Sequence, residues 1–244
     1  MSVYRVNPQR GKEPSEWSVE KFAAIPYEDW VKQIVDLNPL VDAGSIMEPQ
    51  REAVKDAIAS ILFEGLMPAY LELQTIRNLS NSGKPILEQW QPYEDFARKL
   101  WKAHKELMQN AARLMGYEIG FLFQKEEKFR KGLADFRLQY PTTNKGFEGL
   151  FEWVRKEWQE RLADFRNSVL EHRGGDRKDF EDFYKPENAE ILFALVWKSI
   201  ANILPMLLEL KLMNGMRLIE QHPNDPGPRW NQRFMYQPTG VKHS

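Results

Sequence analysis

The sequence contains no cysteine, which excludes disulfides, thiolate-bound metals and cysteine nucleophiles. It also lacks a glycine-rich phosphate-binding loop, a dinucleotide-binding fingerprint and the Gly-x-Ser-x-Gly turn that presents a nucleophilic serine. The first residues, Met1 to Pro8, contain no apolar run of the kind found in signal peptides. We therefore expect a cytoplasmic protein with no cofactor and no metal site.

An excess of charge of either sign is also missing, because 34 basic and 35 acidic residues leave a net charge of −1. A protein whose whole surface attracts nucleic acid is strongly basic, so this composition is compatible only with a local basic groove. Hydrophobic residues make up 42% of the 244, which is ample for a folded core and excludes global disorder.

Apolar residues recur at three- and four-residue steps through most of the chain, and no alternating strand pattern competes with them. The pattern predicts an all-α fold, a bundle of four long helices with extended N- and C-terminal arms. Residues 1–26 form the N-terminal arm, residues 27–221 the helical bundle domain, and residues 222–244 a tail rich in proline and aromatic residues. The helices are expected to begin near Pro49, Pro92, Asn144 and Pro186 and to cover most of residues 49–220.

Two of these helices contain residues that weaken a helix. Pro68 lies inside the first, where a missing backbone N–H predicts a kink. The second is expected to continue as far as Tyr140, although Gly116, Gly120 and Gly132 are costly inside a single rod.

The third helix ends in the stretch with the most chemical content. Its apolar face includes Phe165, and Gly174 with Gly175 supplies a stop signal. His172 therefore belongs to the last turn of this helix, and Arg166 lies almost two turns earlier. Asn167 follows the arginine directly, so the chain shows Arg-Asn, four further residues and then His.

This motif, at the end of one helix and followed by a polar loop and a final apolar helix, resembles the HEPN superfamily. Members of that superfamily are small helical bundles, many of them metal-independent endoribonucleases of toxin, abortive-infection and CRISPR systems. The resemblance implies Arg166, Asn167 and His172 as catalytic residues, RNA as substrate and a homodimer with the cleft at its interface. It also implies a protein antitoxin or other regulator as a partner.

An internal repeat provides a comparison for the motif, because Leu133–Arg137 and Leu162–Arg166 have the same five residues. Only the second copy is followed by asparagine and then histidine. In a straight helix Arg166 and His172 are about 120° from eclipsed and about 9 Å apart along the axis, so they do not touch. A composite site needs a distorted helix end or a second subunit, and the resemblance implies the second subunit.

The chemistry available to such residues is proton transfer and phosphate binding. An imidazole has a pKa suited to proton transfer near neutral pH, and arginine offers a planar set of donors to phosphate oxygens. The plainer interpretation is that Arg166 and His172 bind the last carbonyls of their helix and complement its dipole. The alternatives to a nuclease are a non-catalytic HEPN-like binding or regulatory module and a helical interaction protein unrelated to nucleic acid.

The remaining polar features have simpler interpretations. His104 has no metal-ligating residue three or four positions away, so we interpret it as a surface or boundary histidine. The acidic residues of the loop at 176–187 alternate with basic ones and lack calcium-loop spacing, which favours a solvated loop. Residues 191–213 are apolar, but Lys198 and Glu209 favour a buried core helix over a membrane span.

The C-terminal tail carries an aromatic cluster that includes Trp230, Phe234 and Tyr236. A cluster of this size is seldom exposed on a monomer, so we predict that it packs on the bundle or on a second subunit. Stacking on single-stranded bases is the alternative, because arginines alternate with these rings.

Overall fold

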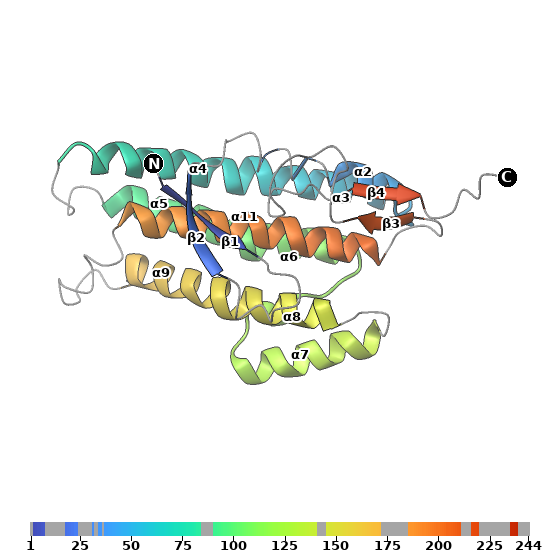
Figure 1. Ribbon diagram of the computed structural model, residues 1–244. Helices are drawn as coiled ribbons and strands as arrows, with labels where there is room; N and C mark the ends of the chain where they lie inside the picture. The colour runs from blue at the N-terminus through green and yellow to red at the C-terminus, as the bar shows by residue number, and fades with distance from the viewer. Residues whose placement is uncertain are drawn as a thin grey trace.

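The computed structural model describes residues 2–7, 18–23, 31, 34–35, 37–83, 90–140, 145–171, 185–210, 216–219 and 235–238. The described chain confirms the predicted all-α fold (Figure 1). Its strands are two short antiparallel pairs, in which β1 (Ser2–Asn7) pairs with β2 (Ser18–Ala23) and β3 (Met216–Ile219) pairs with β4 (Met235–Pro238). Trp230 and Phe234 of the predicted aromatic cluster lie outside the described residues.

Three of the described helical rods have the same construction, an α-helix, one π turn and a second α-helix. The first rod is α3 (Gln50–Ser60), η2 (Ile61–Leu66) and α4 (Met67–Ser80). The second is α5 (Trp90–Trp101), η4 (Lys102–Leu107) and α6 (Met108–Leu114). The third is α8 (Lys145–Trp153), η6 (Val154–Gln159) and α9 (Glu160–Glu171). The remaining helical elements are α2 (Asn38–Ala43), η5 (Gly120–Phe123), α7 (Glu126–Gln139) and α11 (Pro186–Glu209).

The π turn η2 lies just before Pro68, where the sequence predicts a kink. Proline has no N–H to donate to the carbonyl four residues earlier, so a helix must adjust near it. In η2 the backbone bonds span five residues, and the Met67 N–H donates to the Leu62 carbonyl immediately before the proline. The same winding occurs in η4 and η6, which contain no proline, so the π turn is not specific to Pro68.

The second helix ends at Leu114, so the expectation that it continues to Tyr140 is wrong. Gly116 has a φ of +86°, a conformation that glycine adopts without strain. The Tyr117 N–H donates to the Ala112 carbonyl at 2.9 Å and the Gly116 N–H to the Arg113 carbonyl at 2.8 Å, which is the Schellman pattern of a helix end. The chain then turns through η5 into α7. The last helix is also shorter than expected and ends at Glu209.

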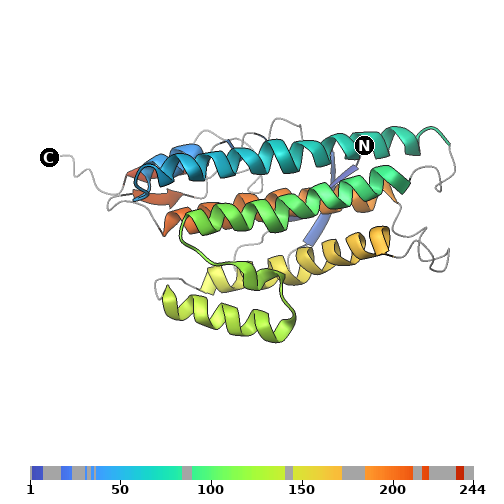
Figure 2. The ribbon, with the colours of Figure 1, turned by 180° about the vertical axis from the view of Figure 1, so that it is seen from behind.

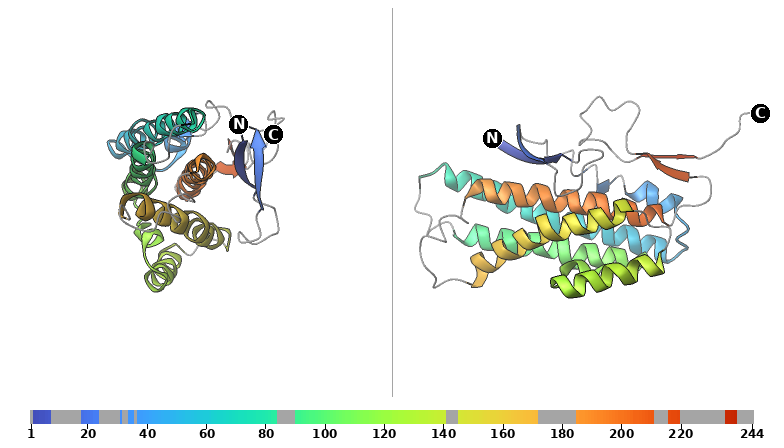
Figure 3. Two further views of the ribbon diagram at one scale, coloured as in Figure 1. Left: turned by 90° about the vertical axis from the view of Figure 1, so that its left-hand side faces the viewer. Right: turned by 60° about the horizontal axis from the view of Figure 1, so that its bottom comes forward.

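The helix α11 occupies the middle of the bundle. Seen end-on in Figure 3, the other rods curve around it, and β1 and β2 lie along its remaining side. The span Pro186–Leu208 of this helix is long and apolar enough to cross a membrane. An 18-residue window within it has a mean hydropathy of 1.9, but 83% of that window is buried inside the bundle. Arg77 on α4 pairs with Glu190 on α11 at 2.6 Å, and both side chains are nearly buried.

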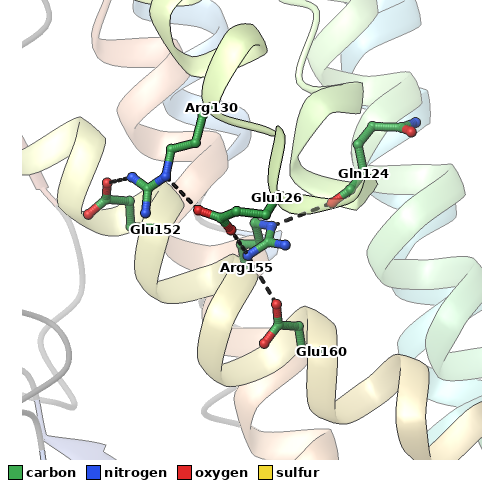
Figure 4. Close-up of polar contacts among 6 residues, drawn as sticks. All are labelled: Gln124, Glu126, Arg130, Glu152, Arg155 and Glu160. Carbon is green, nitrogen blue, oxygen red and sulfur yellow. Dashed lines mark hydrogen bonds and ion pairs between the residues drawn. The ribbon is translucent and has the colours of Figure 1, made fainter. Parts of the chain in front are cut away.

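The helix α7 lies beside α8 on the outer side of the third rod (Figure 2). Arg155 of η6 is only 12% exposed and pairs with Glu126 at 2.5 Å and with Glu160 at 3.0 Å (Figure 4). Arg130 of α7 pairs with Glu126 at 2.6 Å and with Glu152 of α8. Because the arginines hydrogen-bond and attract its carboxylate, the pKa of Glu126 is lowered. The network therefore attaches α7 to the rod that carries the Arg-Asn motif.

The first and second rods approach each other closely at Gly65. A Cβ atom on this residue would lie 2.6 Å from the Ala103 Cβ and 3.0 Å from the Ala103 Cα. The first distance is shorter than real carbon contacts and the second is at their lower limit, and the Ala103 backbone cannot move aside as a flexible side chain does. Only glycine therefore fits where η2 crosses η4.

We expect Gly65→Val to destabilise the protein by about 2–3 kcal/mol, through overpacking against Ala103. Valine and glycine differ little in helix propensity, so the loss reports the close approach. The measurement is urea unfolding followed by circular dichroism. Phe63→Ala serves as the control, because Phe63 lies two residues before Gly65 and its side chain is exposed. It should change stability by less than about 0.5 kcal/mol. Equal stability of Gly65→Val and the native protein would contradict the close crossing.

Candidate functional site

The predicted motif lies at the end of α9, and the structure describes it in part. Arg166 and Asn167 belong to the described helix, which ends at Glu171. His172 lies outside the described residues, so the distance from the arginine to the imidazole stays a prediction.

Arg166 is partly buried and has a fixed orientation. Its guanidinium carbon lies 5.1 Å from the centre of the Trp101 ring, at the end of α5. Its Nη1 donates to the Asn167 Oδ1 at 3.0 Å. No carboxylate in the described part of the chain forms an ion pair with this arginine. A cation held by an aromatic ring and an amide keeps its full charge for an anionic ligand.

Arg137, the last residue of the repeated pentapeptide's first copy, has a different environment. It is 65% exposed and pairs with Glu148 of α8 at 3.1 Å. An exposed ion pair of this kind contributes little to the stability of the fold, but its carboxylate compensates the charge of the arginine. The two copies therefore share a sequence but differ in their surroundings. A carboxylate compensates the charge of Arg137, whereas Arg166 faces an aromatic ring of a neighbouring rod.

Lys105 is a second cation on the same ring. Its ammonium lies 5.2 Å from the centre of the Trp101 ring, and the lysine is partly buried. Sequence reasoning missed both Trp101 and Lys105. The signal available was their four-residue spacing on a helix, which places two side chains on one face.

Three contacts establish how the second and third rods pack. Phe96 meets Phe165 edge-to-face at 6.1 Å, and Trp101 meets Arg166. Further along, His104 lies close to Gln159. Phe165 and Arg166 lie opposite Phe96 and Trp101, whereas the earlier Gln159 lies opposite the later His104, so α5–η4 and η6–α9 run antiparallel (Figure 1). Arg166 and Gln159, two turns apart, lie on the same side of their rod.

His104 is fully buried, and its interpretation as a surface or boundary histidine is wrong. Its Nε2 lies 2.9 Å from the Ser199 Oγ of α11, and its ring meets Phe123 edge-to-face at 5.6 Å. Burial, the larger influence, lowers its pKa to about 3, while the side chain of Gln159 favours the protonated form and opposes this effect. The imidazole is therefore neutral at physiological pH.

Two polar atoms of this interior cluster have no hydrogen-bond partner among the described residues. They are the His104 Nδ1 and the Gln159 Oε1, on side chains that are 0% and 6% exposed. Leaving such atoms without a partner costs free energy.

No family model matches the sequence, and no curated protein or solved structure matches it either. The site must be interpreted from its own residues. A guanidinium and an ammonium that share one indole ring, at the edge of a bundle, are suited to a phosphate group.

We expect acid to destabilise the native protein through His104. The unfolded imidazole takes up a proton near pH 6.5, whereas the folded one resists protonation until about pH 3. Stability from the neutral ring is thus fully present above pH 6.5 and is lost as the pH falls between these values. Urea unfolding at pH 7.5 and pH 4.5 measures the loss.

His104→Gln should be the less acid-sensitive protein, by on the order of 1–3 kcal/mol over this interval, because its side chain stays neutral. Carboxylates titrate alike in both proteins and cancel in the comparison. An identical acid dependence of the two proteins would show that His104 is accessible to protons in the folded state.

Proposed function

We propose that this protein is a metal-independent endoribonuclease of the HEPN type, with Arg166 and His172 as its principal catalytic residues and Asn167 as an auxiliary residue. The observation that carries the proposal is the environment of Arg166. It is oriented by Trp101 and Asn167 and has no ion-pair partner in the described chain, while the arginine of the matching pentapeptide pairs with Glu148.

The proposed reaction uses the nucleophile that RNA carries. The 2′-hydroxyl loses its proton and attacks the adjacent phosphorus, the bond to the 5′-oxygen breaks, and that oxygen receives a proton. The products are a 2′,3′-cyclic phosphate and a 5′-hydroxyl. His172 transfers a proton in this reaction, and Arg166 stabilises the charge that develops on the phosphate oxygens.

A homodimer completes this site in the proposal. The arginine and the histidine of one straight helix end lie on different sides, so a second motif helix across a two-fold axis brings the missing group to each. An antitoxin or regulator would act by covering that interface. Light scattering coupled to size exclusion tests the dimer directly, and a monomer that cleaves RNA at full rate would contradict this arrangement.

We expect Arg166→Ala and His172→Ala each to lower RNA cleavage by at least about a hundredfold, because each removes a group that acts in the transition state. Initial rates on a panel of labelled RNAs measure this. Cleavage should continue in the presence of a chelator and stop when the 2′-hydroxyl at the cut position is replaced by hydrogen.

Arg137→Ala is the matched control, because it alters the same pentapeptide at an exposed ion pair. It should cleave at the native rate, and circular dichroism should show equal helicity in all three variants. Full activity of both motif variants, or no cleavage of any RNA by the native protein, would contradict the proposal. The second outcome would favour a non-catalytic binding module.

A further inference from the structure

Trp101 lies at the junction of α5 and η4 and holds two cations from two rods. Arg166 belongs to α9, and Lys105 lies one turn after Trp101 on the second rod. In the described part of the chain neither cation is paired with a carboxylate. Each cation therefore keeps its charge for an anionic ligand.

The guanidinium of Arg166 has hydrogen-bond donors to spare. A cation–π contact is made with the charge of the group and uses none of its five N–H donors. Asn167 accepts from Nη1, which leaves the other nitrogens of Arg166 able to bind phosphate oxygens. The ring thus orients Arg166 without consuming its hydrogen bonds.

The neighbouring lysine of the same π turn shows the opposite arrangement. Lys102 pairs with Glu64 of η2 at 3.0 Å, so its charge is locally compensated. Lys102 and Lys105 belong to one six-residue element, but only Lys105 faces Trp101. Lys105 therefore has an uncompensated charge next to an aromatic ring, whereas Lys102 is part of an ordinary surface ion pair.

We infer that Trp101, Lys105 and Arg166 together form a phosphodiester-binding site for single-stranded RNA. Lys105 and Arg166 bind backbone phosphate, and Trp101 acts as a positioning residue that keeps Arg166 in place. The inference rests on the proposed function and extends the nuclease site from the end of α9 onto the second rod.

The test measures binding of a fluorescein-labelled, fully 2′-O-methylated RNA to the full-length protein by fluorescence anisotropy. This probe has no free 2′-hydroxyl, so binding is observed without cleavage. Lys105→Ala should weaken binding several-fold at low salt and reduce the slope of log affinity against log salt by about one, because one phosphate contact is lost. Lys102→Ala should match the native protein in both quantities.

Trp101 is tested by two substitutions, since a large loss of ring volume alone can disturb folding. Trp101→Phe keeps an aromatic face and should retain most of the affinity, while Trp101→Leu should weaken binding to the level of Arg166→Ala. Circular dichroism checks that each variant keeps its helices. If Trp101→Leu binds as tightly as the native protein, the positioning role fails.

The outcomes separate this inference from the nuclease proposal. Native protein that binds the methylated RNA through Lys105 but cleaves no unmodified RNA would overturn the nuclease and support the binding site. Cleavage with unchanged affinity and salt slope in Lys105→Ala would overturn the binding site and leave the nuclease. Equal losses in Lys105→Ala and Lys102→Ala, or no binding by the native protein, would overturn the binding site as well.

Discussion

Burial of one imidazole in the middle of the bundle constrains everything packed around it. His104 is surrounded by apolar side chains, and it is accommodated because Ser199 provides a hydrogen-bond partner from α11. Ser199 can reach the imidazole only if α11 has the right position along its axis and the right rotation about it. A buried polar group without a hydrogen-bond partner costs free energy, because the surrounding dielectric is low. The pair thereby fixes the second rod against the central helix. Packing of the third rod against the second then places Arg166 over Trp101.

The π turns explain how three rods can satisfy this constraint together. A π turn adds one residue to a helical turn and rotates the side chains that follow it. His104 and Lys105 lie within one such turn, Gln159 at the end of another, and Gly65 within the third. The turns η2 and η4 meet where Gly65 lies against Ala103, and the turns η4 and η6 meet at the buried imidazole of His104. The π turns therefore determine which side chains of each rod point into the interior of the bundle.

The all-α fold is predictable from the sequence because burial of one helical face imposes a period of 3.6 residues on the apolar positions. The end of the second helix has a signal in Gly116, because glycine readily adopts the positive φ found there. His104 has one as well, since the apolar residues Leu100 and Met108 lie four positions before and after it, on the same helical face. The stacking of Arg166 on Trp101 had no comparable signal. It depends on the register between two rods, and π turns shift that register without leaving a pattern in the sequence.

The position of α11 along the chain has a consequence for biosynthesis. Its partners α4, α5, η4 and η6 are all translated before it, and they pack their apolar sides against a helix that begins only at Pro186. Until that helix leaves the ribosome, the earlier rods lack the partner against which these apolar sides pack. Exposed apolar surface on such an intermediate attracts chaperones and other nascent chains. The core around α11 is therefore completed only after the C-terminal part of the chain has been synthesised.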